Sequence, residues 1–344
     1  MSQRTLDKWL NIKPNKKKNG NANIKKYFYL DWSSGFVPTD AVWLYSKPNN
    51  INFEQTIGWD KLKKGSSFVL CGNFPDIDKK FILEKEKKYW NVPYLKSHLQ
   101  KCTRQMEILK GLKTASHFIH LDLVAFLRRL PIIMIEDVYL HKSFTTIIWL
   151  MVAVSSTEFK MKNYIIEYLL GIVYIICSTK VHDELNEKDK PIENNIEFIS
   201  KSNNLKDNEC SLIYSLILRK HYGGMSCDMI MIDKYIYKWY ERFNSNKYET
   251  NILNEPVNPI EDNLEDLLLD EWILEAVDFH CSNILSYLVK KYNFFTENEL
   301  KEIIWHSLSR KNKRINQKNK YEREFNKIKE YIPHVQKFLL LSNY

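Results

Sequence analysis

Two carboxylates and a lysine near residue 80 have the types and spacing needed for metal-assisted chemistry. Pro75-Asp76 is followed further along by Glu86-Lys87-Lys88. Two carboxylates that share one Mg²⁺ ion can activate a water molecule, while Lys88 steadies that water or a scissile phosphate. The stretch from Glu84 to Lys88 is also a polar charge run, which is typical of a solvated face or turn. Both interpretations stay open, a metal site and an exposed turn.

The same residues resemble the PD…(D/E)xK pattern of metal-dependent nucleases. The resemblance implies a catalytic set of Asp76, Glu86 and Lys88, with Mg²⁺ as the cofactor. We keep a nuclease of this type as an alternative function. The function we favour, described below, is non-enzymatic and predicts no cofactor.

Histidine and cysteine residues form two further groups of potential metal ligands. His117 and His120 are three residues apart on an expected helix, with Asp122 close by, and His280 precedes Cys281. Neither group has the further ligands that a zinc site requires, and the six cysteines include no CxxC pair. We therefore interpret these residues as packing or hydrogen-bonding groups and predict no metal site.

A pair of glycines, Gly223-Gly224, follows the basic run from Arg219 to His221. Glycine lets backbone N–H groups approach an anion closely, so a phosphate-binding turn is one interpretation. Glycine also commonly ends a helix, and this is the interpretation we favour.

A basic segment near the C-terminus is the best candidate for contacts with nucleic-acid phosphates. Aromatic residues interleave with it at Trp305, Tyr321 and Phe325. Such a segment can bind a DNA or RNA backbone without reading its sequence, and it can equally be a solvated helix face. The candidate phosphate-binding residues are Arg310, Lys311, Lys313, Arg314, Lys318 and Lys320.

The first ten residues contain a short apolar peptide with one leading amide. On a single turn of 3₁₀-helix, Leu6, Trp9 and Leu10 project together, and Gln3 is left to form hydrogen bonds beside them. This arrangement predicts a docking peptide. A short amphipathic helix folded onto the body of the protein is the alternative.

The peptide resembles the box by which replication and repair proteins bind the sliding clamp (PCNA). The resemblance implies that Gln3 enters a polar pocket of the clamp and that the apolar trio fills a groove. The family usually ends its box with two aromatic residues, whereas Trp9 is followed here by Leu10, which should weaken binding. The lysines from Lys13 to Lys18 would suit an acidic clamp surface.

Residues 122–140 resemble the C-terminal helical region of replication-associated recombination ATPases, which are relatives of clamp loaders. That region assembles subunits, so the resemblance implies an oligomerisation module. The chain has no GxxxxGK[ST] loop, so no ATPase activity is implied. Alternatively, the charged pairs contact each other or helix ends. The matching residues are Arg128, Arg129, Leu130, Glu136, Asp137, Val138 and Leu140.

The length, composition and net charge of the chain favour a large folded body with an anionic partner. The chain has 344 residues, 44% of them hydrophobic, and a formal net charge of +9. The longest uncharged stretch, Ser143 to Thr157, is too short to span a bilayer, so we expect no membrane partner. The scattered cysteines are typical of a reducing compartment, and we expect an intracellular protein.

The pattern along the chain predicts a mainly α protein, an irregular multi-helical domain after a small mixed α/β region. Apolar periodicity favours helices from Tyr94 onward, including two that are apolar on nearly every side, at 143–156 and 163–178. Pro131 is expected to begin a new element. The predicted units are a disordered tail (1–26), a strand-containing region (27–92), a helical core (93–180), an exposed loop (181–208) and a C-terminal helical region (209–344).

These observations predict an accessory protein of DNA replication or repair. The docking peptide would recruit it to the sliding clamp, and the basic segment would contact DNA. Its expected location is the nucleus or another site of DNA replication. The nuclease and the clamp-loader-like oligomerisation module are the alternatives, and the oligomeric state is left open.

Overall fold

The computed structural model describes residues 26–58, 67–76, 91–185, 205–248, 254–278, 281–291, 295–316 and 318–342. The expected small strand region is a four-stranded mixed sheet in the order β2-β1-β4-β3. Its central strands β1 and β4 are parallel, and the two outer strands are antiparallel to them. The strands are β1 (Tyr27–Asp31), β2 (Val42–Leu44), β3 (Phe53–Gly58) and β4 (Ser67–Asn73).

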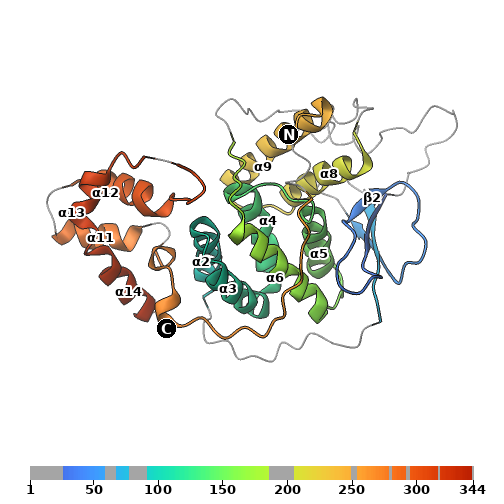
Figure 1. The fold of residues 1–344 in the computed structure, drawn as a ribbon, viewed down its shortest axis with the longest axis horizontal. Coiled ribbons are helices and arrows are strands. Elements are labelled where there is room, and N and C mark those ends of the chain that lie inside the picture. The colour runs from blue at the N-terminus through green and yellow to red at the C-terminus, as the bar shows by residue number, and fades with distance from the viewer. Residues whose placement is uncertain are drawn as a thin grey trace.

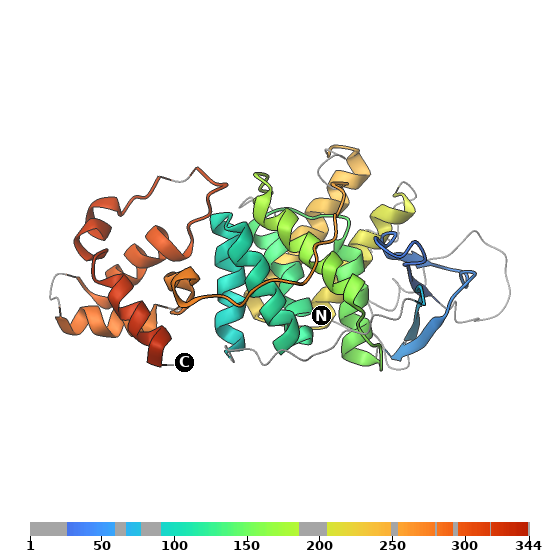
Figure 2. The ribbon, with the colours of Figure 1, turned by 60° about the horizontal axis from the view of Figure 1, so that its bottom comes forward.

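The large core consists of helices that lie between this sheet and a C-terminal bundle (Figures 1 and 2). The helices predicted at 143–156 and 163–178 are confirmed, and both are buried along most of their length because they are apolar all round. The helices are α2 (Val92–Gln105), α3 (Ile108–Leu121), α4 (Leu123–Asp137), α5 (Phe144–Ser156), α6 (Asn163–Ser178), α8 (Asp207–His221) and α9 (Ser226–Ser245).

One buried indole ties the sheet to this helical core. Trp149 of α5 is fully buried, and its Nε1–H lies within hydrogen-bonding distance of two strand carbonyls, Phe28 O at 3.0 Å and Cys71 O at 3.1 Å. A second link joins α8 to the edge strand, where the amide of Trp43 donates to Ser211 Oγ at 3.0 Å. The sheet therefore folds with the large core as one unit.

The prediction that Pro131 begins a new element is wrong. Helix α4 continues through Pro131, although proline removes one helical hydrogen bond. Its neighbours Leu130 and Ile132 are fully buried, so packing on both sides offsets that loss. The break comes earlier, at Asp122, whose carboxylate accepts the amide of Ala125 at 2.9 Å and starts the helix.

The C-terminal bundle has a hydrophobic core of its own, made by residues such as Ile284, Leu300 and Ile332. Helices α8 and α9 belong to the large core instead, so the predicted C-terminal region 209–344 spans parts of both cores. The bundle contains α11 (Ser282–Lys291), α12 (Glu297–Ile304), the π-helical turn η3 (Trp305–Ser309), α13 (Glu322–Ile328) and α14 (Ile332–Ser342).

An extended strap, residues 254–278, crosses the large core and leads into the bundle (Figure 2). It contains the short turns η1 (Leu269–Glu271) and η2 (Leu274–Ala276). The amide of Ile260 donates to Glu167 O of α6 at 2.9 Å. The strap passes so close to Gly171 that a Cβ there would lie 2.3 Å from Asn258 O. Among the described residues, no helix is long and apolar enough to cross a membrane.

Candidate functional site

Arg314, one of the predicted phosphate-binding residues, is used inside the protein. Its guanidinium donates to three main-chain carbonyls, Thr103 O at 2.5 Å, Ile176 O at 2.6 Å and Thr179 O at 2.8 Å. These carbonyls lie at the C-terminal ends of α2 and α6, where a cation stabilises the helix dipole. We therefore remove Arg314 from the residues predicted to contact nucleic acid.

The residues around Arg314 fasten the bundle to the large core. Asn312 Nδ2 donates to Asp137 O at 3.0 Å, and Arg104 Nη1 donates to Ser309 O at 2.8 Å. The ammonium group of Lys101 donates to the same Ser309 carbonyl. Burial, with a contribution from Arg104, lowers the pKa of Lys101 to about 8. This polar contact between the two cores is called the junction below.

The remaining residues of the basic segment face solvent on the bundle. Arg310, Lys311, Lys318 and Lys320 are exposed. Lys313 is also exposed, and its ammonium lies 3.4 Å from a carboxylate oxygen of Glu107.

Two aromatic residues belong to the same part of the chain as these cations. Trp305 is 43% exposed at the start of the π-helical turn, and the ammonium of Lys320 lies 4.6 Å from the ring centroid of Tyr321. We call Arg310, Lys311, Lys313, Lys318 and Lys320 with Trp305 the basic surface.

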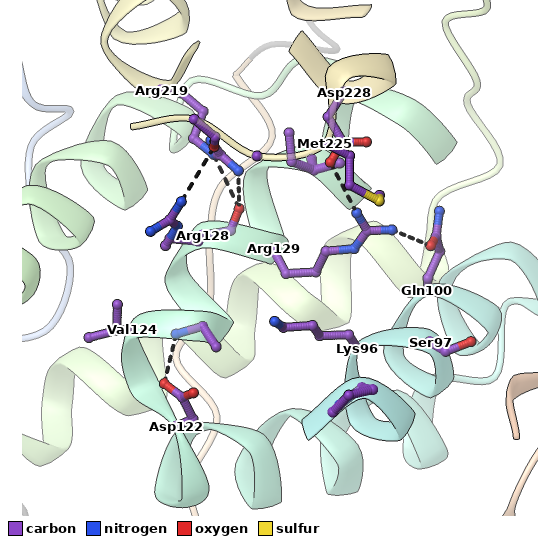
Figure 3. Close-up of a pocket in the computed structure, with 15 residues that line it drawn as sticks. Lys96, Ser97, Gln100, Asp122, Val124, Arg128, Arg129, Arg219, Met225 and Asp228 are labelled. Carbon is purple, nitrogen blue, oxygen red and sulfur yellow. Dashed lines mark hydrogen bonds and ion pairs between the residues drawn. The ribbon is translucent and has the colours of Figure 1, made fainter. Parts of the chain in front are cut away.

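A second cationic site lies in the large core, between α2, α4 and the turn that joins α8 to α9. Figure 3 shows this pocket of about 560 Å³, which we call the arginine pocket. Four cationic and two anionic side chains line it: Lys96, Arg128, Arg129, Arg219, Asp122 and Asp228.

Two of the pocket arginines are held by main-chain carbonyls. Arg219 is only 3% exposed and donates to Arg128 O and Gly223 O, both at 2.8 Å. Burial, followed by the neighbouring Arg128 cation, lowers the pKa of Arg219 to about 10. Arg128 in turn donates to Tyr222 O at 2.8 Å, just beyond α8. The carbonyls that hold these guanidinium groups carry no full charge, so the pocket keeps a cationic surplus.

The predicted helix end at Gly223-Gly224 is confirmed. Helix α8 ends at His221, and the two glycines take φ values of 74° and 156°, which favour glycine. The turn also borders the arginine pocket. The phosphate-binding interpretation of this turn therefore stays open beside the helix end.

Arg129 is oriented by side chains from two other helices. Its Nη2 donates to Gln100 Oε1 at 2.5 Å, and its Nη1 lies 3.6 Å from Asp228 Oδ2. Its Nε–H is buried and has no hydrogen-bond partner in the part of the chain that the structure describes. The guanidinium is thus fixed in place with one donor unused.

The charged pairs near residue 130 contact each other and helix ends. Arg129 lies 3.9 Å from Glu136, while Asp137 accepts Arg104 Nε at 2.5 Å. Arg128 contacts the end of α8, as described above. Val138 and Leu140 are fully buried, and Tyr139 donates to Glu255 at 2.9 Å. These contacts fit a structural role, and the resemblance to clamp-loader relatives stays a prediction.

The predicted catalytic and docking residues are only partly described. Asp76 is exposed just after β4, whereas Glu86 and Lys88 lie outside the described residues. The docking residues Gln3, Leu6, Trp9 and Leu10 also lie outside them.

The histidine pair contacts the strap. His120 Nε2 lies 2.7 Å from Asp262, and His117 lies 4.0 Å from Asp266. Asp122 caps α4 and does not join them. Within the described ranges, no group of three potential metal ligands is present.

Cys281 has a structural environment. It is buried at the start of the bundle, and its thiol lies 3.6 Å from Ser309 Oγ. Burial raises the pKa of this thiol, which makes it a poor nucleophile at neutral pH. His280 lies outside the described residues.

The sequence does not predict the arginine pocket. Its pattern singles out Arg128, Arg129, Arg219 and Gly223-Gly224 separately, for other reasons. Their convergence depends on how α4 packs beside the α8–α9 turn. Comparison with protein-family models, with curated proteins and with solved structures finds no match.

Proposed function

We propose that this protein is an accessory factor of DNA replication or repair that contacts DNA through its C-terminal bundle. The N-terminal peptide with Gln3, Leu6, Trp9 and Leu10 would dock on the sliding clamp. The basic surface would then hold the phosphate backbone without reading the base sequence.

The charge distribution is the observation that carries this proposal. Residues 281–344 contain 13 Lys and Arg against six Asp and Glu, a formal charge of +7. Residues 27–280 contain 30 against 35, a formal charge of −5, and residues 1–26 contain eight against one. DNA would therefore be repelled by the large core as a whole and attracted to the bundle and the tail.

The geometry of the bundle supports backbone binding. Exposed lysines and arginines release counterions when they neutralise phosphates, which supplies affinity independent of sequence. Trp305 is exposed at the start of the π-helical turn that precedes Arg310, and its ring can stack on an unpaired base. The junction through Arg314 couples the bundle to the large core, so the whole folded body would be held on DNA.

Tethering explains how such a surface can act with modest affinity. A clamp-bound peptide raises the local concentration of the bundle at DNA, even though the two contacts are made by separate parts of the chain. Each contact should therefore be separable by mutation.

The DNA contact is tested by replacing Arg310, Lys311, Lys318 and Lys320 with glutamine. A matched control replaces four exposed lysines of the large core with glutamine: Lys160, Lys180, Lys206 and Lys247. Binding of fluorescent DNA is measured by anisotropy between 50 and 200 mM salt. We expect the slope of log K against log salt to become about 3.6 less steep in the basic-surface variant, at roughly 0.9 for each of the four lost phosphate contacts. Equal losses in both variants would contradict the proposal.

The clamp contact is tested separately. Trp9→Ala should abolish capture of the chain by an immobilised sliding clamp and leave binding to free DNA unchanged. Capture that survives Trp9→Ala would refute the docking role. Mg²⁺-dependent cleavage of the DNA that is lost in Asp76→Ala would support the nuclease alternative instead.

A further inference from the structure

We propose that the arginine pocket binds the terminal phosphate of a phosphate monoester, such as a nucleotide or the phosphorylated end of a nucleic-acid strand. This inference goes beyond the proposed function, because its residues lie in the large core and are distinct from the basic surface.

The side chains that line the arginine pocket carry more positive than negative charge. Lys96, Arg128, Arg129 and Arg219 oppose Asp122 and Asp228, so the lining has a formal surplus of two positive charges. A phosphate monoester carries a charge of about −1.5 to −2 near neutral pH. The ligand would therefore neutralise the pocket.

A buried arginine cation is costly unless an anion lies close to it. Arg219 is almost completely buried, and its hydrogen-bond partners among the described residues are all uncharged main-chain carbonyls. Withdrawing a cation from water costs several kcal/mol unless a counter-charge is close. Asp228 is on the pocket wall, and it already lies 3.6 Å from Arg129. An added anion would lower this cost.

Two nitrogen donors at the pocket have no hydrogen-bond partner among the described residues. Arg129 has a buried Nε–H without a hydrogen-bond partner, while Gln100 and Asp228 hold its two terminal nitrogens. Among the described residues, Lys96 has no hydrogen bond or ion pair, and its ammonium extends from α2 into the pocket (Figure 3). Lys96 can donate to a phosphate oxygen without breaking a native contact.

The main chain adds to this set. Helix α9 begins at Ser226 with no side-chain cap, so its first N–H groups keep their hydrogen-bonding capacity next to Met225 on the pocket wall. A Cβ on Gly224 would lie 3.9 Å from Arg219 Nη2, so the turn passes directly beside the buried guanidinium.

The size of the site favours an ester over a free ion. The arginine pocket of about 560 Å³ is within the range of small-molecule sites and much larger than phosphate alone. A second pocket of about 570 Å³ adjoins it and shares Val124 and Arg128. Ile57, Phe68 and Leu218 give this neighbour an apolar lining, which suits the group esterified to the phosphate.

Calorimetric titration of the full chain tests the proposal with four probes: inorganic phosphate, adenosine 5′-monophosphate, and one short oligonucleotide with a 5′-phosphate or a 5′-hydroxyl group. We expect the phosphate-bearing probes to bind and the 5′-hydroxyl strand to bind at least tenfold more weakly than its phosphorylated partner. Tighter binding of the mononucleotide than of inorganic phosphate would assign the neighbouring pocket to the esterified group. Equal binding of the two strands, with no binding of phosphate or the mononucleotide, would overturn the proposal.

Two substitutions localise the binding. Lys96→Gln removes a charge with no native partner among the described residues, so it should fold normally and weaken phosphate binding at least tenfold. Arg129→Gln should weaken it further, and Lys160→Gln, an exposed position outside the pocket, should not change it. Unchanged binding in Lys96→Gln would place the anion elsewhere and overturn the proposal. Glutamine substitutions on the basic surface leave this pocket intact. The proposal of DNA binding by the basic surface and the proposal of phosphate binding by the pocket can therefore be refuted independently.

Discussion

The large core and the C-terminal bundle differ in how much apolar surface they bury and in the sign of their charge. The core buries apolar helices such as α5 along most of their length and has a formal negative charge over residues 27–280. The bundle has short helices, a small hydrophobic core and a formal charge of +7 over residues 281–344. A small core supplies little stability by itself. The difference indicates that the core supplies rigidity and the bundle supplies a charged surface. We expect the stability of the bundle to depend on the junction.

The largest expected effect comes from Trp149 in the large core. Trp149→Ala removes a fully buried indole together with its contacts to two strand carbonyls, and we expect a loss of about 3–5 kcal/mol in the free energy of unfolding. Urea unfolding followed by circular dichroism measures this loss. Trp305→Ala is the matched control in the bundle, where the exposed ring should contribute under about 1 kcal/mol. Similar losses for both tryptophans would break the comparison.

The junction should come next. Arg314→Met removes hydrogen bonds to three helix-end carbonyls, and we expect the free energy of unfolding to fall by about 2–3 kcal/mol. The bundle should then unfold at a lower urea concentration than the core. Hydrogen exchange of α11 and α12 against α5 measures the separation. Arg310→Met removes an exposed charge and should leave one shared transition; separate transitions in both variants would show that Arg314 is not the coupling residue.

The smallest of the three effects is a pH dependence located in the large core. His98 is fully buried, lies 2.7 Å from Thr114 Oγ1 and accepts the amide of Ile273 at 2.9 Å, which ties the strap to α2. Burial, with a contribution from Lys110, lowers its pKa to about 3. The unfolded chain therefore takes up this proton first as the pH falls below about 6.5. Stability present above that pH is lost between about pH 6.5 and 3, by about 2 kcal/mol at pH 5.

Urea titrations at pH 5 and pH 7 measure this loss. His98→Gln should be less stable at pH 7 and should show a smaller difference between the two pH values. His141 titrates in the same direction, because burial lowers its pKa to about 4, and it remains in both proteins. An unchanged difference in the variant would remove His98 as the source.

The accuracy of the sequence predictions follows the kind of signal available. Helices α5 and α6 were placed closely because residues apolar on every side of a helix can only be buried. The prediction for Pro131 was wrong because the local chemistry of proline favours a helix break, whereas tertiary packing keeps α4 continuous. The end of α8 was predictable because glycine readily takes the positive φ that commonly ends a helix.

The candidate sites were harder to predict for a different reason. Lys313 and Arg314 are neighbours with the same charge, yet one faces solvent and the other caps two helices. Composition assigns both to a basic segment, and only the docking of the bundle separates them. The arginine pocket joins Arg128 and Arg219, whose convergence no local pattern in the chain encodes.

Hydrogen–deuterium exchange of the intact protein with and without DNA tests the division between the two regions most directly. We predict that DNA slows exchange at residues 305–320 on the bundle and leaves α5 and α6 of the large core unchanged. Slower exchange confined to residues 27–248, with the bundle unaffected, would contradict the account.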